Sequence, residues 1–185
     1  MTRKELFELA EQDGRTYLGD LSDGTPVFTK KGPNHLDNHP EVAALVPEVL
    51  GNAAMADFDG QNLSKVVDLG RVVGISTCVE TTAADEIVYA RRTGRQWGCT
   101  RFVKGRKGVD CQTVVLRLYL NDEGLVALMT AYIGAEAPAE PCTRAALGNF
   151  DQCCDFWRSH ALCWDGEVES EIFSEDDFFT APSDE

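Results

Sequence analysis

The sequence lacks any long apolar segment. No run approaches the roughly 18 consecutive apolar residues that a membrane-spanning helix needs. The opening residues, MTRKELFELAEQ, are charged and contain no apolar core, so we expect no secretory signal there. These absences predict a cytoplasmic protein that does not associate with a membrane.

The cysteines lack a paired spacing. There are seven of them, an odd number, and their positions follow no regular framework. Small secreted proteins that depend on disulfides carry their cysteines in such frameworks. The pattern therefore argues against a disulfide scaffold and favours a reducing compartment.

A complete set of metal ligands is also missing. The stretch HLDNH, at 35–39, has suitable spacing but no fourth ligand nearby. A second set, made of Cys153, Cys154, His160 and Cys163, includes two cysteines on the apolar stripe of an expected helix, where buried thiols are ordinary core residues. We predict no metal and no other cofactor.

One segment lacks acidic residues in a chain that is otherwise acidic. The protein has 17 basic and 31 acidic residues, a net charge of −14, yet residues 91–107 hold seven cations and no acid. One interpretation is a solvated edge strand whose charges block unwanted pairing. The other is a phosphate-binding surface, on which Phe102 and Trp97 would stack against unpaired bases.

The order of the expected elements predicts an α+β fold with a curved antiparallel β-sheet and flanking helices. A helix is expected over 2–11, a hairpin over 15–30, and a helix over 40–50 that Pro47 interrupts. Strand patterns dominate from residue 65, and the strongest hairpin spans 111–134. Residues 149–162 then read as an amphipathic helix.

These patterns divide the chain into three parts. We expect an accessory segment at 1–60, a core at 61–164 and an acidic tail at 165–185. The tail holds nine acids and no base, which is typical of a disordered solubilising segment. Because Ile172, Phe173, Phe178 and Phe179 lie among these acids, a second interpretation is that the tail folds back over residues 91–107.

Four short stretches resemble a known group of enzymes. TRFV at 100–103, TAYIG at 130–134, the proline-rich loop around Pro138–Pro141 and FWRSHAL at 156–162 are similar to the phage and bacterial barnase–EndoU–colicin–RelE nucleases. The resemblance covers roughly residues 65–165. It implies a toxin-like hydrolase that cleaves RNA without a metal, on the concave face of its sheet.

The resemblance also implies roles for individual residues. Arg101 would stabilise charge on phosphorus, and Thr130 would donate a hydrogen bond to a phosphoryl oxygen. Arg91 and Lys104 would hold adjacent phosphates.

The acid and base are less defined. His160 would be the acid, or the base if Glu80 is not, although a lone histidine on a helix flank is usually structural. No single residue of the sequence identifies the base.

The sequence therefore favours a ribonuclease-like domain with RNA as its partner, together with an inhibitor or a host protein. The alternative is a non-catalytic acidic interaction protein that mimics nucleic acid or binds a basic host factor. A third class is a nucleic-acid-binding module that does not cleave.

Overall fold

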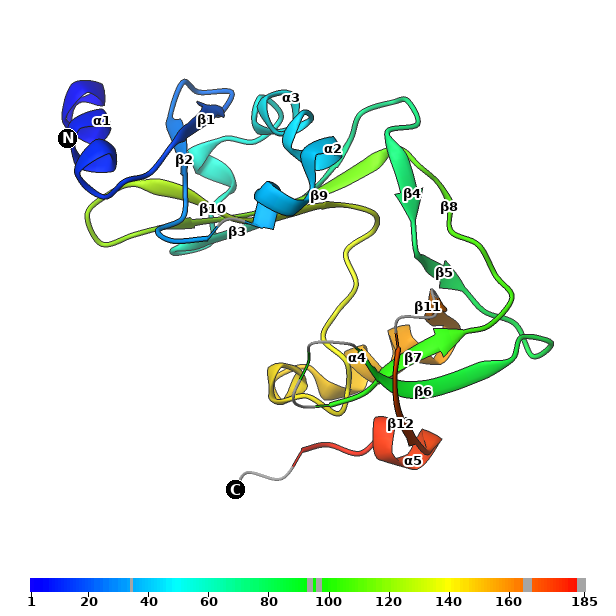
Figure 1. Ribbon diagram of the computed structural model, residues 1–185. Helices are drawn as coiled ribbons and strands as arrows, with labels where there is room; N and C mark the ends of the chain where they lie inside the picture. The colour runs from blue at the N-terminus through cyan, green and yellow to red at the C-terminus, as the bar shows by residue number, and fades with distance from the viewer. Residues whose placement is uncertain (34, 93–94, 96–97, 165–167, 183–185) are drawn as a thin grey trace. The chain divides into compact units, whose positions relative to one another are not determined.

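The chain forms two compact units, one made of Met1–Gly74 and Cys111–Ala135, the other of Ile75–Asp110 and Glu136–Glu185 (Figure 1). The computed structural model describes residues 1–33, 35–92, 95, 98–164 and 168–182. The division differs from the predicted segments 1–60, 61–164 and 165–185. Residues 111–134 belong to the same unit as the N-terminal segment because their strands pair with it.

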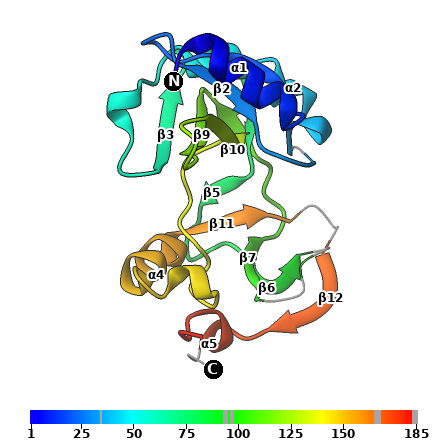
Figure 2. The same cartoon turned by 90° about the vertical axis from the view of Figure 1, so that its left-hand side faces the viewer.

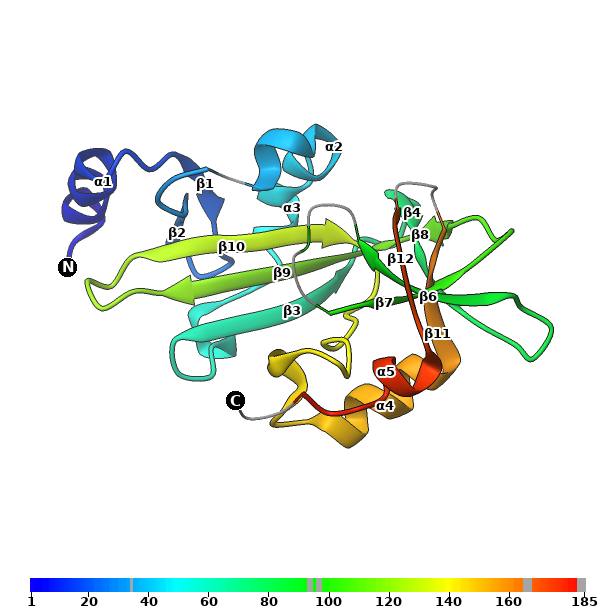
Figure 3. The same ribbon diagram turned by 60° about the horizontal axis from the view of Figure 1, so that its bottom comes forward.

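The first unit is built on a five-stranded sheet with the strand order β1-β2-β10-β9-β3. The hairpin of β9 (Thr113–Leu120) and β10 (Val126–Ile133) lies at its centre, beside β3 (Asn62–Asp68), as Figure 3 shows. The expected hairpin of β1 (Tyr17–Asp20) and β2 (Pro26–Thr29) is present, and β2 adds to β10 in parallel. The segment expected to be accessory is thus part of the sheet.

Short helices cover this sheet. Helix α1 (Arg3–Gln12) begins at Thr2, whose hydroxyl accepts from the Glu5 N–H while the Glu5 carboxylate accepts from the Thr2 N–H, a capping box. Helices α2 (Pro40–Ala43) and α3 (Val46–Leu50) are separate, as Pro47 predicts. Two 3₁₀ helices, His35–Asn38 and Met55–Asp57, complete the segment. The valines and leucine of α3 are buried in one core with the leucines of β9 and β10.

The second unit has its own five-stranded sheet, in the order β12-β6-β7-β11-β5 (Figure 2). Its strands are β5 (Cys78–Glu80), β6 (Ile87–Arg92), β7 (Thr100–Val103), β11 (His160–Cys163) and β12 (Val168–Phe173). Strand β7 is antiparallel to β6 and parallel to β11, and β11 is antiparallel to β5. Elsewhere, β4 (Gly74–Ser76) and β8 (Val109–Cys111) form a two-stranded sheet.

Helix α4 (Phe150–Ser159) packs beside the second sheet after a short 3₁₀ helix, Arg144–Ala146. Cys153, Cys154 and Trp157 are buried on the predicted stripe. The helix ends earlier than predicted: His160 is already extended, and residues 160–163 form β11 because they pair with two strands. Tertiary pairing overrides helical periodicity here.

The acidic C-terminal segment is part of the second unit. Strand β12 pairs with β6, and the short helix α5 (Glu175–Phe178) follows it (Figure 2). The Phe178 ring is fully buried, with centroids 5.3 Å from Tyr89 and 6.1 Å from Trp157. Residues 168–178 are therefore sheet and core rather than a solvating tail, and their contact with the 91–107 segment is confirmed at Arg91, which pairs with Glu171.

The α+β class is confirmed, with two open sheets in place of a single curved one. Each large sheet contains one parallel pair among its antiparallel neighbours. Within the described ranges, no helix has both the length and the apolar content to cross a membrane.

Phe178 should contribute strongly to the stability of the second unit. Phe178→Ala removes a fully buried ring, so we expect a loss of about 3–5 kcal/mol in the free energy of unfolding. Ile172→Ala, in the same segment but 61% exposed, is the control and should change it by less than about 0.5 kcal/mol. Urea unfolding followed by tryptophan fluorescence measures both. Equal stability of the two variants would contradict the buried position of Phe178.

Candidate active site

Arg101 lies in the middle of the second sheet, and its side chain is bound inside the protein. The residue is 8% exposed. Its Nη1 donates to the His160 carbonyl oxygen at 2.7 Å and to Thr81 Oγ1 at 3.0 Å. Tyr89 lies opposite Arg101 on β6 and hydrogen-bonds to it. Burial raises the pKa of Tyr89, whereas the hydrogen bond with Arg101 lowers it. Arg101 therefore fastens the end of β5 and the start of β11 to β7.

The pairing of β5 with β11 places Glu80 directly opposite His160. Directly opposed residues of an antiparallel pair have Cβ atoms roughly 5 Å apart and point to the same face. The adjacent pair, Val79 and Ala161, is buried on the other face. Glu80 is exposed and His160 half-buried, so a carboxylate and an imidazole occupy neighbouring positions on the solvent-facing side of the sheet.

The imidazole of His160 has a defined orientation. Its ring stacks on Phe156, with centroids 4.1 Å apart and planes 7° from parallel. Nδ1 lies 3.0 Å from the Phe156 carbonyl oxygen and 3.0 Å from Ser159 Oγ. Because a carbonyl oxygen only accepts, the bond to Phe156 assigns the proton to Nδ1. Nε2 is then the atom that accepts or releases a proton in a reaction.

Arg106 brings a guanidinium group to the same place. Its Nη1 donates to Asp85 Oδ1 at 3.0 Å, and its Nη2 lies 3.5 Å from the Glu80 carbonyl oxygen. The Thr82 backbone N–H and the Arg106 guanidinium lower the pKa of Asp85. The sequence did not single out Arg106 as a site residue, because its nearness to Glu80 depends on the fold. Its position among the cations of 91–107 was the one sequence feature that pointed to it.

Arg101, expected to stabilise charge on phosphorus, and Phe102, expected to stack on a base, do not lie where those roles require. Arg101 aligns with Ala161 rather than with His160, so its side chain and the imidazole point to opposite faces. It donates to the backbone of His160 and is buried, so its guanidinium is not accessible to a phosphate. Phe102 is 3% exposed and packs edge-on against Trp164, with centroids 5.6 Å apart, so its ring is closed to a base.

Thr130 and Trp97 are the two further candidates. Thr130 is on β10 and belongs to the first unit, whereas Glu80, Arg101 and His160 belong to the second. Trp97 falls outside the described residues.

Four of the seven cations of residues 91–107 pair with acids of the second unit. Arg91 pairs with Glu171 at 2.6 Å and lies over the Phe173 ring. Lys104 pairs with Glu86 at 2.7 Å and lies over the Trp164 ring. The remaining pairs are Arg95 with Glu140 and Arg106 with Asp85. The purely positive segment of the sequence is thus partly neutralised in the fold.

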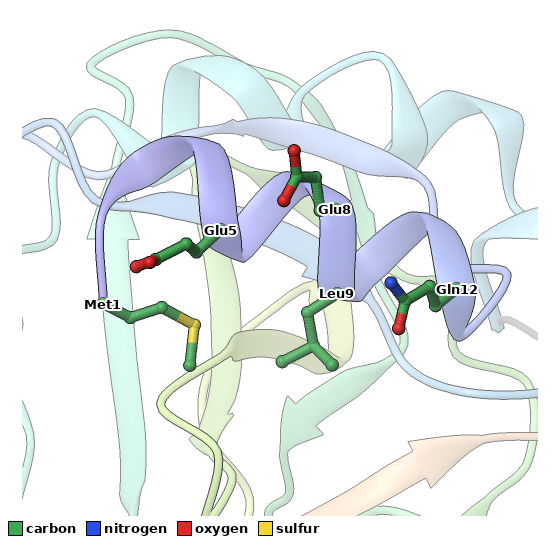
Figure 4. A pocket seen from close by; sticks show the side chains of 5 residues that line it. All are labelled: Met1, Glu5, Glu8, Leu9 and Gln12. Atoms are coloured by element: carbon green, nitrogen blue, oxygen red, sulfur yellow. The ribbon is translucent and has the colours of Figure 1, made fainter.

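Among the described residues, neither a metal site nor the pocket along α1 adds catalytic chemistry. In the part of the chain that the structure describes, no three His, Cys, Asp or Glu side chains gather as metal ligands. A pocket of about 470 Å³ lies along α1, lined by Met1, Glu5, Glu8, Leu9 and Gln12 (Figure 4). Its Glu5 carboxylate already serves the helix cap.

Comparisons of the chain with protein-family models, with curated proteins and with solved structures found no match. The site is therefore interpreted from its own geometry.

Arg101 should be a positioning residue whose loss weakens the second unit. Arg101→Met leaves the His160 carbonyl and the Thr81 hydroxyl without their donor, and we expect a loss of about 1–3 kcal/mol in the free energy of unfolding. Lys107→Gln, at an exposed cation of the same segment, should stay within about 0.5 kcal/mol of the wild type. Urea unfolding distinguishes them. A neutral effect of Arg101→Met would contradict the assigned role.

Proposed function

We propose that the second unit is a metal-independent, ribonuclease-like domain in which Glu80 and His160 form the acid–base pair. The observation that carries this proposal is their direct opposition across β5 and β11 on the solvent-facing side of the sheet. Cleavage of RNA through its own 2′-hydroxyl needs two proton-transfer groups on either side of one phosphate. A carboxylate and an imidazole at neighbouring positions meet that need.

The reaction uses each group once. The Glu80 carboxylate removes the proton from the ribose 2′-OH, and the 2′ oxygen forms a bond to the adjacent phosphorus. The bond from phosphorus to the 5′ oxygen breaks, and His160 Nε2–H protonates that leaving oxygen. The products are a 2′,3′-cyclic phosphate and a free 5′-hydroxyl end. The opposite assignment, with neutral His160 as the base, uses the same two groups.

Cations next to the pair would balance the charge that develops on phosphorus. Arg106 takes the role first expected of Arg101, since its guanidinium lies beside the Glu80 backbone and is partly exposed. Lys104 keeps its expected role of holding a flanking phosphate. Its ion pair with Glu86 is largely exposed, and such pairs are worth about 0–1 kcal/mol, so a phosphate can replace the carboxylate. Arg91 does not keep this role, because Tyr89 aligns with Arg101 and Arg91, two residues further along β6, therefore lies on the face opposite His160.

A second candidate function is a non-catalytic acidic protein that binds a basic host protein. The observation that favours it is the pairing of four of the seven 91–107 cations with acids of the same unit, in a chain of net charge −14. Such a surface attracts a basic partner and repels RNA. Both candidates act in the cytoplasm in this proposal.

Cleavage of RNA in the presence of EDTA tests the first candidate. His160→Ala and Glu80→Gln should each slow cleavage of total RNA by about 10²–10⁴-fold, the contribution of a positioned acid or base. The thermal midpoint should stay near that of the wild type. His39→Ala, at a half-buried histidine of the first unit, is the matched control and should cleave normally. Unchanged cleavage in His160→Ala, or dependence on added metal, would overturn the assignment.

Binding of RNA to the His160→Ala variant separates the two candidates. The ribonuclease proposal expects binding at low salt that weakens steeply as salt rises, because the contacts are made to phosphates. Fluorescence anisotropy with a labelled single-stranded RNA measures this dependence. Absence of binding at low salt would remove the ribonuclease proposal and leave the acidic interaction protein.

A further inference from the structure

Two cysteines of the second unit meet although 43 residues separate them in the chain. Cys99 precedes β7, and Cys142 lies in the loop that leads to α4. Their sulfur atoms are 3.7 Å apart. The Cys142 sulfur also lies 3.4 Å from the Cys99 backbone nitrogen, which donates to it, and 3.3 Å from the Cys99 carbonyl oxygen.

The loop that carries Cys142 is held in place by bonds that do not involve the thiols. Trp157 Nε1 donates to the carbonyl oxygens of Pro138 and Ala139. The Glu140 carboxylate accepts from Thr100 Oγ1 at 2.9 Å and from Arg95 Nη1 at 3.0 Å. The sulfur atoms are therefore brought together by the fold rather than by their own weak attraction.

Gly98 makes this close approach feasible. Its φ of +74° is a conformation that other residues rarely adopt. A Cβ at this position would lie 3.2 Å from a Thr143 methyl carbon and 3.7 Å from the Cys142 sulfur. A side chain here would thus crowd the loop that carries Cys142.

The pair is open to a small molecule from one side. Cys99 and Cys142 line a pocket of about 570 Å³, which is also bordered by Phe173, Asp177 and Thr180. Cys142 is half-buried, whereas Cys99 is 4% exposed. A molecule in the pocket therefore reaches Cys142 first, with Cys99 behind it.

The pKa values of the two thiols also favour reaction at Cys142 before Cys99. Hydrogen bonds from Cys99 lower the pKa of the Cys142 thiol to about 7, although burial opposes the shift. The pKa of Cys99 is raised by its partner and by burial, with smaller contributions from Asp177 and Glu140. The thiolate is the form of cysteine that attacks a disulfide.

We propose that Cys142 and Cys99 form a redox-active dithiol that exchanges with a small disulfide entering this pocket. The Cys142 thiolate attacks one sulfur of the disulfide RSSR, forms a mixed disulfide and releases one thiolate, which takes up a proton as RSH. Cys99 loses its proton and attacks the Cys142 sulfur, which forms the protein disulfide and releases the second RSH. The protein is oxidised by two electrons and RSSR is reduced to two thiols.

The disulfide would tie the start of β7 to the loop before α4. The two sulfur atoms must move from 3.7 Å to a bond of about 2.0 Å, a small change for side chains already in contact. A cross-link between residues 99 and 142 closes a long loop and restricts the unfolded chain. We therefore expect the oxidised protein to have a higher thermal midpoint than the reduced protein.

Oxidised glutathione, added to the reduced full-length protein, tests the proposal. Peptide mass spectrometry should find Cys99 linked to Cys142 in the wild type. Cys99→Ser should accumulate a glutathione adduct at Cys142, because the second step is blocked. Cys142→Ser should lose both the adduct at this site and the rise in thermal midpoint. Cys111→Ser, at another half-buried cysteine, is the matched control and should behave as the wild type does.

Two results would overturn the proposal. One is a wild-type protein that forms no Cys99–Cys142 link under these conditions. The other is a Cys99→Ser variant that carries glutathione equally on its other cysteines. Should a variant fail to fold, the order of alkylation in the reduced wild type decides: iodoacetamide must modify Cys142 before Cys99, and the reverse order contradicts the proposal.

Discussion

The buried guanidinium of Arg101 is the interaction on which the second unit depends. Burying a charge is costly unless its donors are satisfied. Here Nη1 donates to both the His160 carbonyl and the Thr81 hydroxyl, whereas the buried Nε has no hydrogen-bond partner among the described residues. These acceptors lie on β11 and just after β5, whereas Arg101 lies on β7. The Arg101 side chain thus links three strands at the point where Glu80 faces His160. Because Arg101 fixes these strands from one face of the sheet, the other face can present the Glu80 and His160 side chains.

The C-terminal segment completes this unit. Strand β12 covers the edge of β6, Phe178 fills the core beside Tyr89, and Glu171 neutralises Arg91. The same segment supplies Phe173, Asp177 and Thr180 to the pocket in front of Cys142. Its acidic composition is therefore compatible with a structural role, since its aromatic rings provide burial while its carboxylates pair with cations or face water.

Features that depend on neighbouring residues were predictable, and those that depend on distant pairing were not. The Thr2 cap, the β9–β10 hairpin and the buried stripe of α4 follow from local patterns. The parallel pairings of β2 with β10 and of β7 with β11 join distant segments, so the predicted boundaries failed. The burial of Phe102 also depends on distant pairing, so its position among cations in the sequence suggested exposure. The acids that pair with Arg91 and Lys104 are distant in the sequence, and so are Cys99 and Cys142, so neither contact had a sequence signal. Glu80 and His160 were chosen by residue type; only the register of β5 and β11 pairs them.

A double-mutant cycle on RNA cleavage tests most directly whether Glu80 and His160 act as one catalytic pair. Single-turnover cleavage rates in EDTA would be measured for the wild type, Glu80→Gln, His160→Ala and the double variant, with circular dichroism to confirm folding. Two groups that serve the same transition state give strongly non-additive losses. If Glu80 and His160 act as one pair, the double variant cleaves about as slowly as the slower single variant. Losses that multiply, or a folded wild-type protein that leaves RNA intact, would contradict this assignment.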